Sequence, residues 1–179
     1  MTPILAIDTS TSRTCVAVIA GANFLFNDYR DGATAHGPAL PELVQAALKL
    51  SSIDEVVVGM GPGPFTGLRV GIAFAQSFAL ARNIPVRGVC SLDAIAAHVL
   101  ERDFIITVDA RRKEVYWARY QDGVRIGEPA VNFPNEVTGA VIYADLFPDM
   151  RALVALPGNI TEPIYLRRPD AVPTAERKA

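Results

Sequence analysis

The chain has 179 residues, half of them apolar, and its mean hydropathy is +0.24. This composition predicts a packed globular fold rather than a disordered chain. The formal net charge of -2 and the sequence pI of about 5.7 exclude a global basic field, so tight RNA binding by the isolated chain is not expected.

Cysteine usage and hydropathy predict a cytoplasmic protein. Cys15 and Cys90 form no CxxC pair, which argues against a disulfide framework and against a zinc site. His36 and His98 lack the HxxxH and HExxH spacings of metal sites, so no metal site is predicted. We see no signal peptide, and the longest apolar stretch, residues 70–81, is shorter than the roughly 20 residues that cross a bilayer.

Apolar periodicity predicts strands and helices in the following order. A strand at residues 4–7 ends at Asp8, and strands at 14–20 and 24–26 form a hairpin. The further predicted elements are a helix after Gly37-Pro38, a strand at 56–58, a helix at 66–82, a strand at 86–89 and a helix from Ser91 to about Leu100. In the last of these, Ser91 is a suitable N-cap.

The pattern restarts near residue 101, which predicts a duplication. An apolar strand ends at Asp109, and placing Asp109 on Asp8 without a gap places Tyr116 on Cys15. A chance match of two β-hairpins is the alternative. Beyond Phe133 prolines interrupt the pattern, so we expect a first lobe at 1–100, a reduced second lobe at 101–168 and a flexible tail at 169–179.

The glycine–proline loop at residues 59–67 lies between a strand and a helix, where phosphate-binding loops occur. A phosphate cradle needs successive backbone N–H groups, and Pro62 and Pro64 have none. A Gly-Lys-Ser/Thr sequence is also missing. The loop is therefore predicted to be a stiff start to the next helix rather than a nucleotide site.

The helix at 66–82 has small residues four positions apart, at Gly67, Gly71 and Ala75. Such a stripe allows another helix to approach closely. Most other positions are also apolar, so the helix is either fully buried or shared between the core and a partner interface. Both alternatives stay open on the sequence.

Four segments closely resemble the TsaB (YeaZ) family. They are residues 4–10 (ILAIDTS), 61–71 (GPGPFTGLRVG), 109–118 (DARRKEVYWA) and, more weakly, 163–167 (PIYLR). The resemblance covers about residues 1–120, and the glycine–proline motif is specific to this family and its relatives. It implies an α/β fold of two ribonuclease-H-like lobes of the actin/hexokinase/Hsp70 (ASKHA) type, with the second lobe reduced.

Relatives of this fold bind ATP at Asp–Gly–Thr-type turns after the first strand of each lobe. Here the corresponding turns are Asp8-Thr9-Ser10 and, in the second lobe, Asp109 followed by alanine and arginine. Glycine allows a close approach of the backbone to phosphate, which threonine and arginine do not. The resemblance therefore implies a vestigial nucleotide site at Asp8, Thr9, Ser10 and Asp109.

The resemblance further implies a non-catalytic partner of TsaD, the subunit that carries the metal and transfers threonylcarbamoyl to adenosine 37 of tRNA. The ATPase TsaE joins the assembly, the free chain forms a homodimer, and ATP and metal bind to the partner subunits rather than to this chain alone. The expected partner-binding residues lie on the helices at 38–50 and 66–82 and are Leu43, Val44, Phe65, Gly67, Leu68, Arg69, Gly71, Ile72 and Ala75. Substituting Gly71 by arginine or Ile72 by glutamate is expected to disrupt assembly but not folding.

The sequence raises three other functions. A small ATP-dependent phosphotransferase would use Asp8 and Asp109 to hold magnesium. Direct tRNA binding would use Arg111, Arg112 and Lys113 with the C-terminal basic residues, although tRNA contact is expected to be indirect or weak. Peptidase activity is not expected, because no G-x-S-x-G elbow is present.

Overall fold

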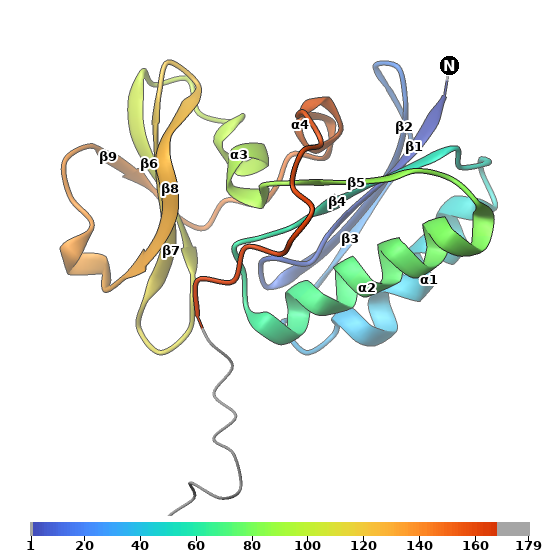
Figure 1. Cartoon of the computed structure of the whole chain (residues 1–179), viewed down its shortest axis with the longest axis horizontal. Helices are drawn as coiled ribbons and strands as arrows, with labels where there is room; N and C mark the ends of the chain where they lie inside the picture. Colours follow the sequence, from blue (N-terminus) through green and yellow to red (C-terminus); the bar gives the residue numbers. More distant parts are fainter. Residues whose placement is uncertain (1, 168–179) are drawn as a thin grey trace, which may run out of the picture.

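The computed structural model describes residues 2–167, and the tail expected at 169–179 lies outside the described residues. The described chain forms two β-sheets side by side, with helices around the first sheet and between the two (Figure 1). Within residues 2–167, no helix is both long enough and apolar enough to cross a membrane.

The first sheet has five strands in the order β3-β2-β1-β4-β5. Its elements are β1 (Pro3–Asp8), β2 (Arg13–Ala20), β3 (Asn23–Asp31), α1 (His36–Leu48), β4 (Glu55–Gly59), α2 (Phe65–Arg82) and β5 (Val86–Val89). Strands β1, β2 and β3 are antiparallel neighbours, whereas β4 pairs in parallel with both β1 and β5. The sheet is therefore mixed, with β1 at its centre.

Both faces of the first sheet are covered, which explains why its central strands are apolar throughout. Leu5 and Ile7 of β1 face α1 and α2, while Ala6 faces α4 (Met150–Ala155) on the opposite side. The alternation follows from the two-residue period of a strand. Figure 1 shows α1 and α2 on one side of this sheet and α4 on the other.

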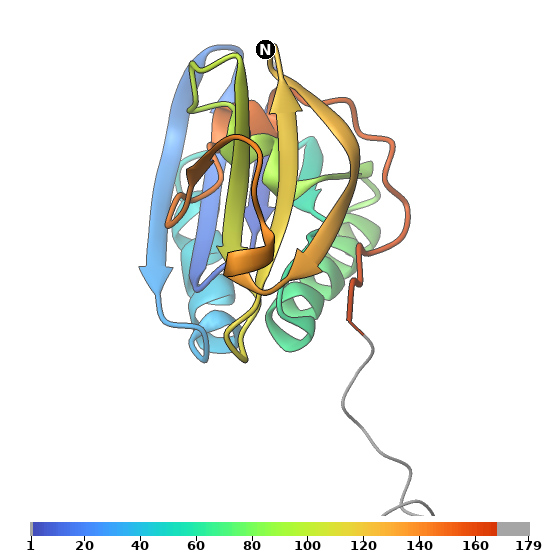
Figure 2. The same cartoon turned by 90° about the vertical axis from the view of Figure 1, so that its left-hand side faces the viewer.

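The second sheet repeats the order of the first without a fifth strand. Its elements are α3 (Ser91–Ala96), β6 (Asp103–Asp109), β7 (Val115–Gln121), β8 (Val124–Asn132), η1 (Pro134–Glu136) and β9 (Val141–Tyr143). The strand order is β8-β7-β6-β9, antiparallel for β6, β7 and β8 and parallel for β6 and β9. In Figure 2 this sheet faces the viewer, and the segment with η1 crosses in front of it.

Strand pairing corrects one detail of the predicted repeat. Asp8 pairs with Cys15, whereas Asp109 pairs with Val115 and not with Tyr116. The loop after Asp109 is thus one residue shorter than the loop after Asp8. A sequence match without a gap does not reveal this difference, because it compares single strands and not the pairing between them. The pairing of β7 with β8 has an irregularity of its own between Trp117 and Arg119.

The helix predicted to continue to Leu100 ends earlier. α3 stops at Ala96, and Leu100 is 95% exposed, because residues 97–102 have to connect α3 to the start of β6. Ser91 is not the N-cap, since Cys90 takes that position and the Ser91 hydroxyl donates to Asp8 Oδ2 at 2.6 Å. Apolar spacing alone could not show where the chain leaves the helix.

The chain returns to the first sheet after β9. α4 packs on β1, β2 and β4, although its residues belong to the segment assigned to the second lobe. Arg87 of β5 holds the end of α4, because its guanidinium donates to Leu156 O at 2.6 Å and to Val154 O, and pairs with Glu55. The lobe boundaries at 100 and 168 stay a prediction.

Candidate functional site

Helix α2 has a buried face that packs against its own sheet. That face consists of Gly67, Leu68, Gly71, Ile72, Ala75 and Ala79. A Cβ on Gly67 would lie 3.0 Å from the His36 ring, and a Cβ on Gly71 would collide with the Thr9 hydroxyl. The small-residue stripe therefore makes room for His36 and for the loop after β1, within the same chain.

The expected partner-binding residues divide into buried and accessible positions in this structure. The residues buried within this chain are Leu43, Val44, Gly67, Leu68, Gly71, Ile72 and Ala75. Of the predicted set, Phe65 is half-buried and Arg69 is exposed. Buried side chains cannot contact a partner while the fold is intact. Because Gly71 and Ile72 are buried, we now expect Gly71→Arg and Ile72→Glu to destabilise the fold rather than to spare it.

The opposite side of α2 is the surface that the sequence did not single out. We call Val70, Ala73, Phe74, Ser77, Leu80 and Ala81 the outer α2 face. Val70 and Phe74 are half-buried, and the other four are exposed, Leu80 by 84%. The Phe74 ring stacks on Phe78 at 6.0 Å, and α2 contains no aspartate or glutamate. An uncharged apolar helix face of this kind is characteristic of an interaction site.

We expect Gly71→Ala to lower the free energy of unfolding by about 2 kcal/mol, since the added methyl group would displace Thr9 in a packed interior. The Thr9 hydroxyl also donates to Gly67 O at 2.8 Å, and that bond would be strained. Urea unfolding measures the change. Gly37→Ala in α1 is the matched control, because no atom outside the adjacent residues lies within 4 Å of the new methyl group. Pro38 follows directly and disfavours a helical backbone at a residue with a Cβ, so the change in stability should stay within about 1 kcal/mol. Equal effects of both substitutions would contradict the packing argument.

Asp8 ends β1 in a closed polar cluster. Its Oδ1 accepts from Ser10 N at 2.8 Å and Ser10 Oγ at 2.7 Å, and its Oδ2 accepts from Ser91 Oγ. Asp8, Thr9 and Ser10 are buried, and the glycine–proline loop covers them, with Gly63 against the Ser10 backbone. The three residues expected to form part of a vestigial nucleotide site are therefore closed off from solvent.

Asp109 lies apart from that cluster. It is exposed, accepts from Arg111 N at 2.8 Å and pairs with the Arg111 guanidinium at 3.3 Å. The equivalent ends of the two lobes therefore differ: the Asp8 carboxyl is enclosed and the Asp109 carboxyl is in solvent. Among residues 2–167 the two aspartates share no hydrogen-bond partner.

Burial raises the pKa of the Asp8 carboxyl above its ordinary value of 3.8, against the opposing hydrogen bonds from Ser91 and Ser10. A raised folded-state pKa stabilises the fold at low pH, and this contribution is lost as pH rises through that pKa. Asp8→Asn should therefore gain stability relative to the parent protein as pH rises, by about 1.4 kcal/mol per pH unit between the unfolded and folded pKa values. Urea unfolding of both proteins at pH 5 and pH 8 measures this gain. If the difference between their free energies of unfolding is the same at both pH values, the expectation is contradicted.

A cleft of about 850 Å³ opens between the two lobes. Its walls are the start of α2, the loop after β6, and the C-terminal segment, with Arg111, Arg112 and Arg167 along it. The sequence identified the first two arginines as a basic cluster, but only the fold brings Arg167 beside them. The Arg111 guanidinium pairs there with Asp109, and the Arg167 guanidinium pairs with Glu114.

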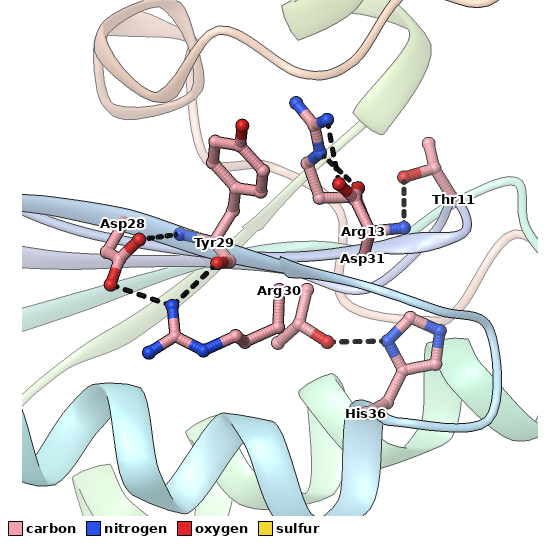
Figure 3. Close-up of polar contacts among 8 residues, drawn as sticks. Thr11, Arg13, Asp28, Tyr29, Arg30, Asp31 and His36 are labelled. Carbon is pink, nitrogen blue, oxygen red and sulfur yellow. Dashed lines mark hydrogen bonds and ion pairs between the residues drawn. The ribbon is translucent and has the colours of Figure 1, made fainter.

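His36 lines the same cleft at the start of α1. Its Nδ1 lies 2.8 Å from Thr14 Oγ1, along the dashed line that ends on the His36 ring in Figure 3. Burial lowers the pKa of His36, while the Asp8 carboxyl and the Thr11 backbone act in the opposite direction. The buried neutral ring thus connects α1 to β2 and fills the space that Gly67 leaves.

The neighbouring edge of the first sheet is fixed by ion pairs. Arg13 pairs with Asp31 at 2.8 Å, and Arg30 pairs with Asp28 at 2.8 Å (Figure 3). The Arg13 guanidinium also lies over the Tyr29 ring at 3.7 Å. These contacts orient the end of β3, from which the chain passes to His36.

The loop after β6 has an unusual backbone. Arg111, Arg112 and Lys113 all have positive φ, at 63°, 54° and 66°. Each non-glycine residue in this left-handed region costs on the order of 1 kcal/mol. Such a run persists only when surrounding contacts hold it.

The repeated sheet order, with a second sheet that has one strand fewer and packs on α3, agrees with two ribonuclease-H-like lobes of the ASKHA type, the second of them reduced. Agreement in shape with solved structures supports this fold. A Pseudomonas aeruginosa structure described as similar to the peptidase YeaZ has a TM-score of 0.77 at 25% identity, over 93% of this chain and 100% of that chain. YeaZ from the same organism has a TM-score of 0.72 over 86% and 90%.

Sequence comparison identifies the family to which the chain belongs. A family model described as TsaD, tRNA N6-adenosine threonylcarbamoyltransferase, matches residues 33–139. A Mycobacterium tuberculosis protein of uncharacterised function is 40% identical over 96% of this chain and 95% of its own length. The Escherichia coli tRNA threonylcarbamoyladenosine biosynthesis protein TsaB is 36% identical over 70% of this chain and 59% of TsaB. The chain belongs to the TsaB (YeaZ) family, as the sequence predicted.

Lengths differ among these relatives. The chain spans 59% of the Escherichia coli TsaB and 48% of a Mycobacterium leprae protein that is 43% identical. The alignment with the Mycobacterium tuberculosis protein has 201 positions against the 179 residues of this chain, so that relative carries residues that this chain lacks.

Proposed function

We propose that this chain is a non-catalytic subunit of the assembly that installs N6-threonylcarbamoyl on tRNA adenosine, and that it binds and supports the catalytic subunit TsaD. Membership of the TsaB family and the match to the TsaD family model support this role. The observation that carries this proposal is the outer α2 face, an apolar surface that is still exposed when the isolated chain is folded.

The outer α2 face and its surroundings, which we propose as the docking surface, have the composition of a protein interface. Its centre is the outer α2 face, and Arg69 and Gln76, which are exposed and lie one helical turn from Ala73 and Leu80, are polar. An apolar centre with a polar rim is the usual organisation of such interfaces. We propose that a second copy of the chain occupies this surface in the free protein, and that TsaD replaces it. Recruitment of TsaE is part of the same proposal.

The closed Asp8 cluster supports a role without catalysis. The Asp8 carboxyl is occupied by donors from Ser10 and Ser91, and the glycine–proline loop leaves no approach for a phosphate. We propose that ATP and metal bind to partner subunits. The phosphotransferase alternative is not favoured, since it needs Asp8 in contact with magnesium.

Co-purification of this chain with the TsaD of the same organism, followed by mass determination and a tRNA threonylcarbamoylation assay, tests the proposal. We expect a stable complex whose activity is lost when this chain is omitted. Full activity without this chain would overturn the role. The same assay with TsaD held constant and this chain titrated shows whether it acts in a fixed ratio, as a subunit does.

A further inference from the structure

The left-handed run in the loop after β6 needs an external support. Ala110 and Glu114 bracket the three residues, and two backbone bonds close the loop: Ala110 N donates to Glu114 O at 2.9 Å, and Glu114 N donates to Arg111 O at 3.0 Å. Asparagine, aspartate and glycine tolerate this conformation, but arginine and lysine gain nothing from it. Arg111 N also donates to Asp109 Oδ1 at 2.8 Å. A run of three strained residues depends on contacts with neighbouring segments in addition to these local bonds.

Arg167 contacts both ends of this run. Its Nη1 donates to Ala110 O at 3.1 Å, and its Nη2 forms an ion pair with the Glu114 carboxylate. The Arg167 and Glu114 side chains are only 26% and 25% exposed, so solvent screens this pair less than a surface pair. The planar guanidinium fork suits such a two-point contact in a way that an ammonium group does not.

The segment that carries Arg167 is itself attached to the first lobe. Ile160 N donates to Gly88 O at 3.2 Å, and Ile164 N donates to Met60 O at 2.8 Å. The Tyr165 ring lies 5.0 Å from the Phe65 ring at the start of α2. The segment that carries Arg167 is therefore bonded to the first lobe, while the Arg167 side chain contacts a loop of the second lobe.

We propose that Arg167 is a positioning residue that holds loop 110–114 in its left-handed turn and so keeps Arg111 and Arg112 along the interlobe cleft. Without Arg167 the loop relaxes toward right-handed or extended backbone and withdraws from the cleft. This inference goes beyond the proposed subunit role, because it concerns the isolated chain and needs no partner.

Amide hydrogen exchange on the full-length isolated protein tests the proposal. In Arg167→Ala, exchange at the amides of Ala110 and Glu114 should become about tenfold faster, the change expected when a contact that holds a local structure is lost. Exchange in the interior of β6 should stay unchanged. Arg102→Ala is the matched control, since Arg102 pairs with Asp122 at the other end of the same hairpin, and it should leave both amides as they are.

The decisive variant combines Arg167→Ala with Lys113→Gly. Glycine adopts positive φ without strain, so it should restore slow exchange at Ala110 and Glu114. A merely structural loss would not be rescued in this way. Unchanged exchange in Arg167→Ala, or no rescue by Lys113→Gly, would overturn the proposal. If Arg167→Ala alone does not fold, Glu114→Gln, which removes only the ion pair, should give the same local acceleration, and its absence would equally overturn it.

Discussion

Ala73→Arg is expected to weaken binding to TsaD by at least about 100-fold, which corresponds to roughly 3 kcal/mol. Ala73 lies at the centre of the outer α2 face and is exposed in the isolated chain. In a docked complex, a long charged side chain there would separate the two apolar surfaces or be buried without a partner. The fold should be unaffected, because arginine is a good helix former at an exposed position.

Calorimetric titration of the variant with TsaD, together with its melting temperature, gives both quantities. Val124→Arg is the matched control, because Val124 is 64% exposed at the turn between β7 and β8, away from α2. The control should bind as the parent protein does. Parent-like binding by Ala73→Arg would show that the docking surface lies elsewhere. The subunit role would then lose its structural observation and would rest on family membership and on the activity assay.

Ile72→Glu is expected to destabilise the fold by about 4 kcal/mol or more, a large part of the roughly 5–15 kcal/mol that stabilises a domain. Ile72 is 5% exposed and packs in the core between α2 and the first sheet. A glutamate there would be charged without a partner or would have to be protonated, and both states are costly. The substitution should therefore prevent assembly by unfolding the chain.

Thermal unfolding followed by circular dichroism measures this effect. Ile72→Leu conserves volume and apolarity and should cost less than about 1.5 kcal/mol. If Ile72→Glu melts near the parent temperature, the orientation of α2 in the fold is incorrect. Because Ala73 and Ile72 are adjacent, opposite outcomes at the two positions would define which side of α2 faces the protein and which faces a partner.

Local patterns predicted much of the fold. The strand that ends at Asp8 and the strand that ends at Asp109 are present, and the second sheet repeats the order of the first. The prolines of the glycine–proline loop argue against a phosphate cradle, and in the structure this loop covers Ser10. These features depend on residues that are close together in the chain, so local sequence patterns predict them directly.

The orientation of α2 could not be predicted in this way. A helical period fixes the angles between residues on one helix, but a polar stripe is needed to show which side faces solvent. In α2, Leu68 and Ile72 are as apolar as Phe74 and Leu80, so apolarity does not distinguish the side that faces the sheet from the side that faces solvent. Most of the predicted partner-binding residues of α2 face the sheet.

By itself, the sequence determined the family, the duplicated order of strands and the positions of the two strand-end aspartates. Only the tertiary structure decided that Asp8 is closed off while Asp109 is exposed, and that Arg167 joins Arg111 and Arg112 at one cleft. It also decided which face of α2 remains outside. The physical reason is that burial depends on contacts between residues far apart in the chain, such as Thr9 with Gly71 and Arg167 with Glu114.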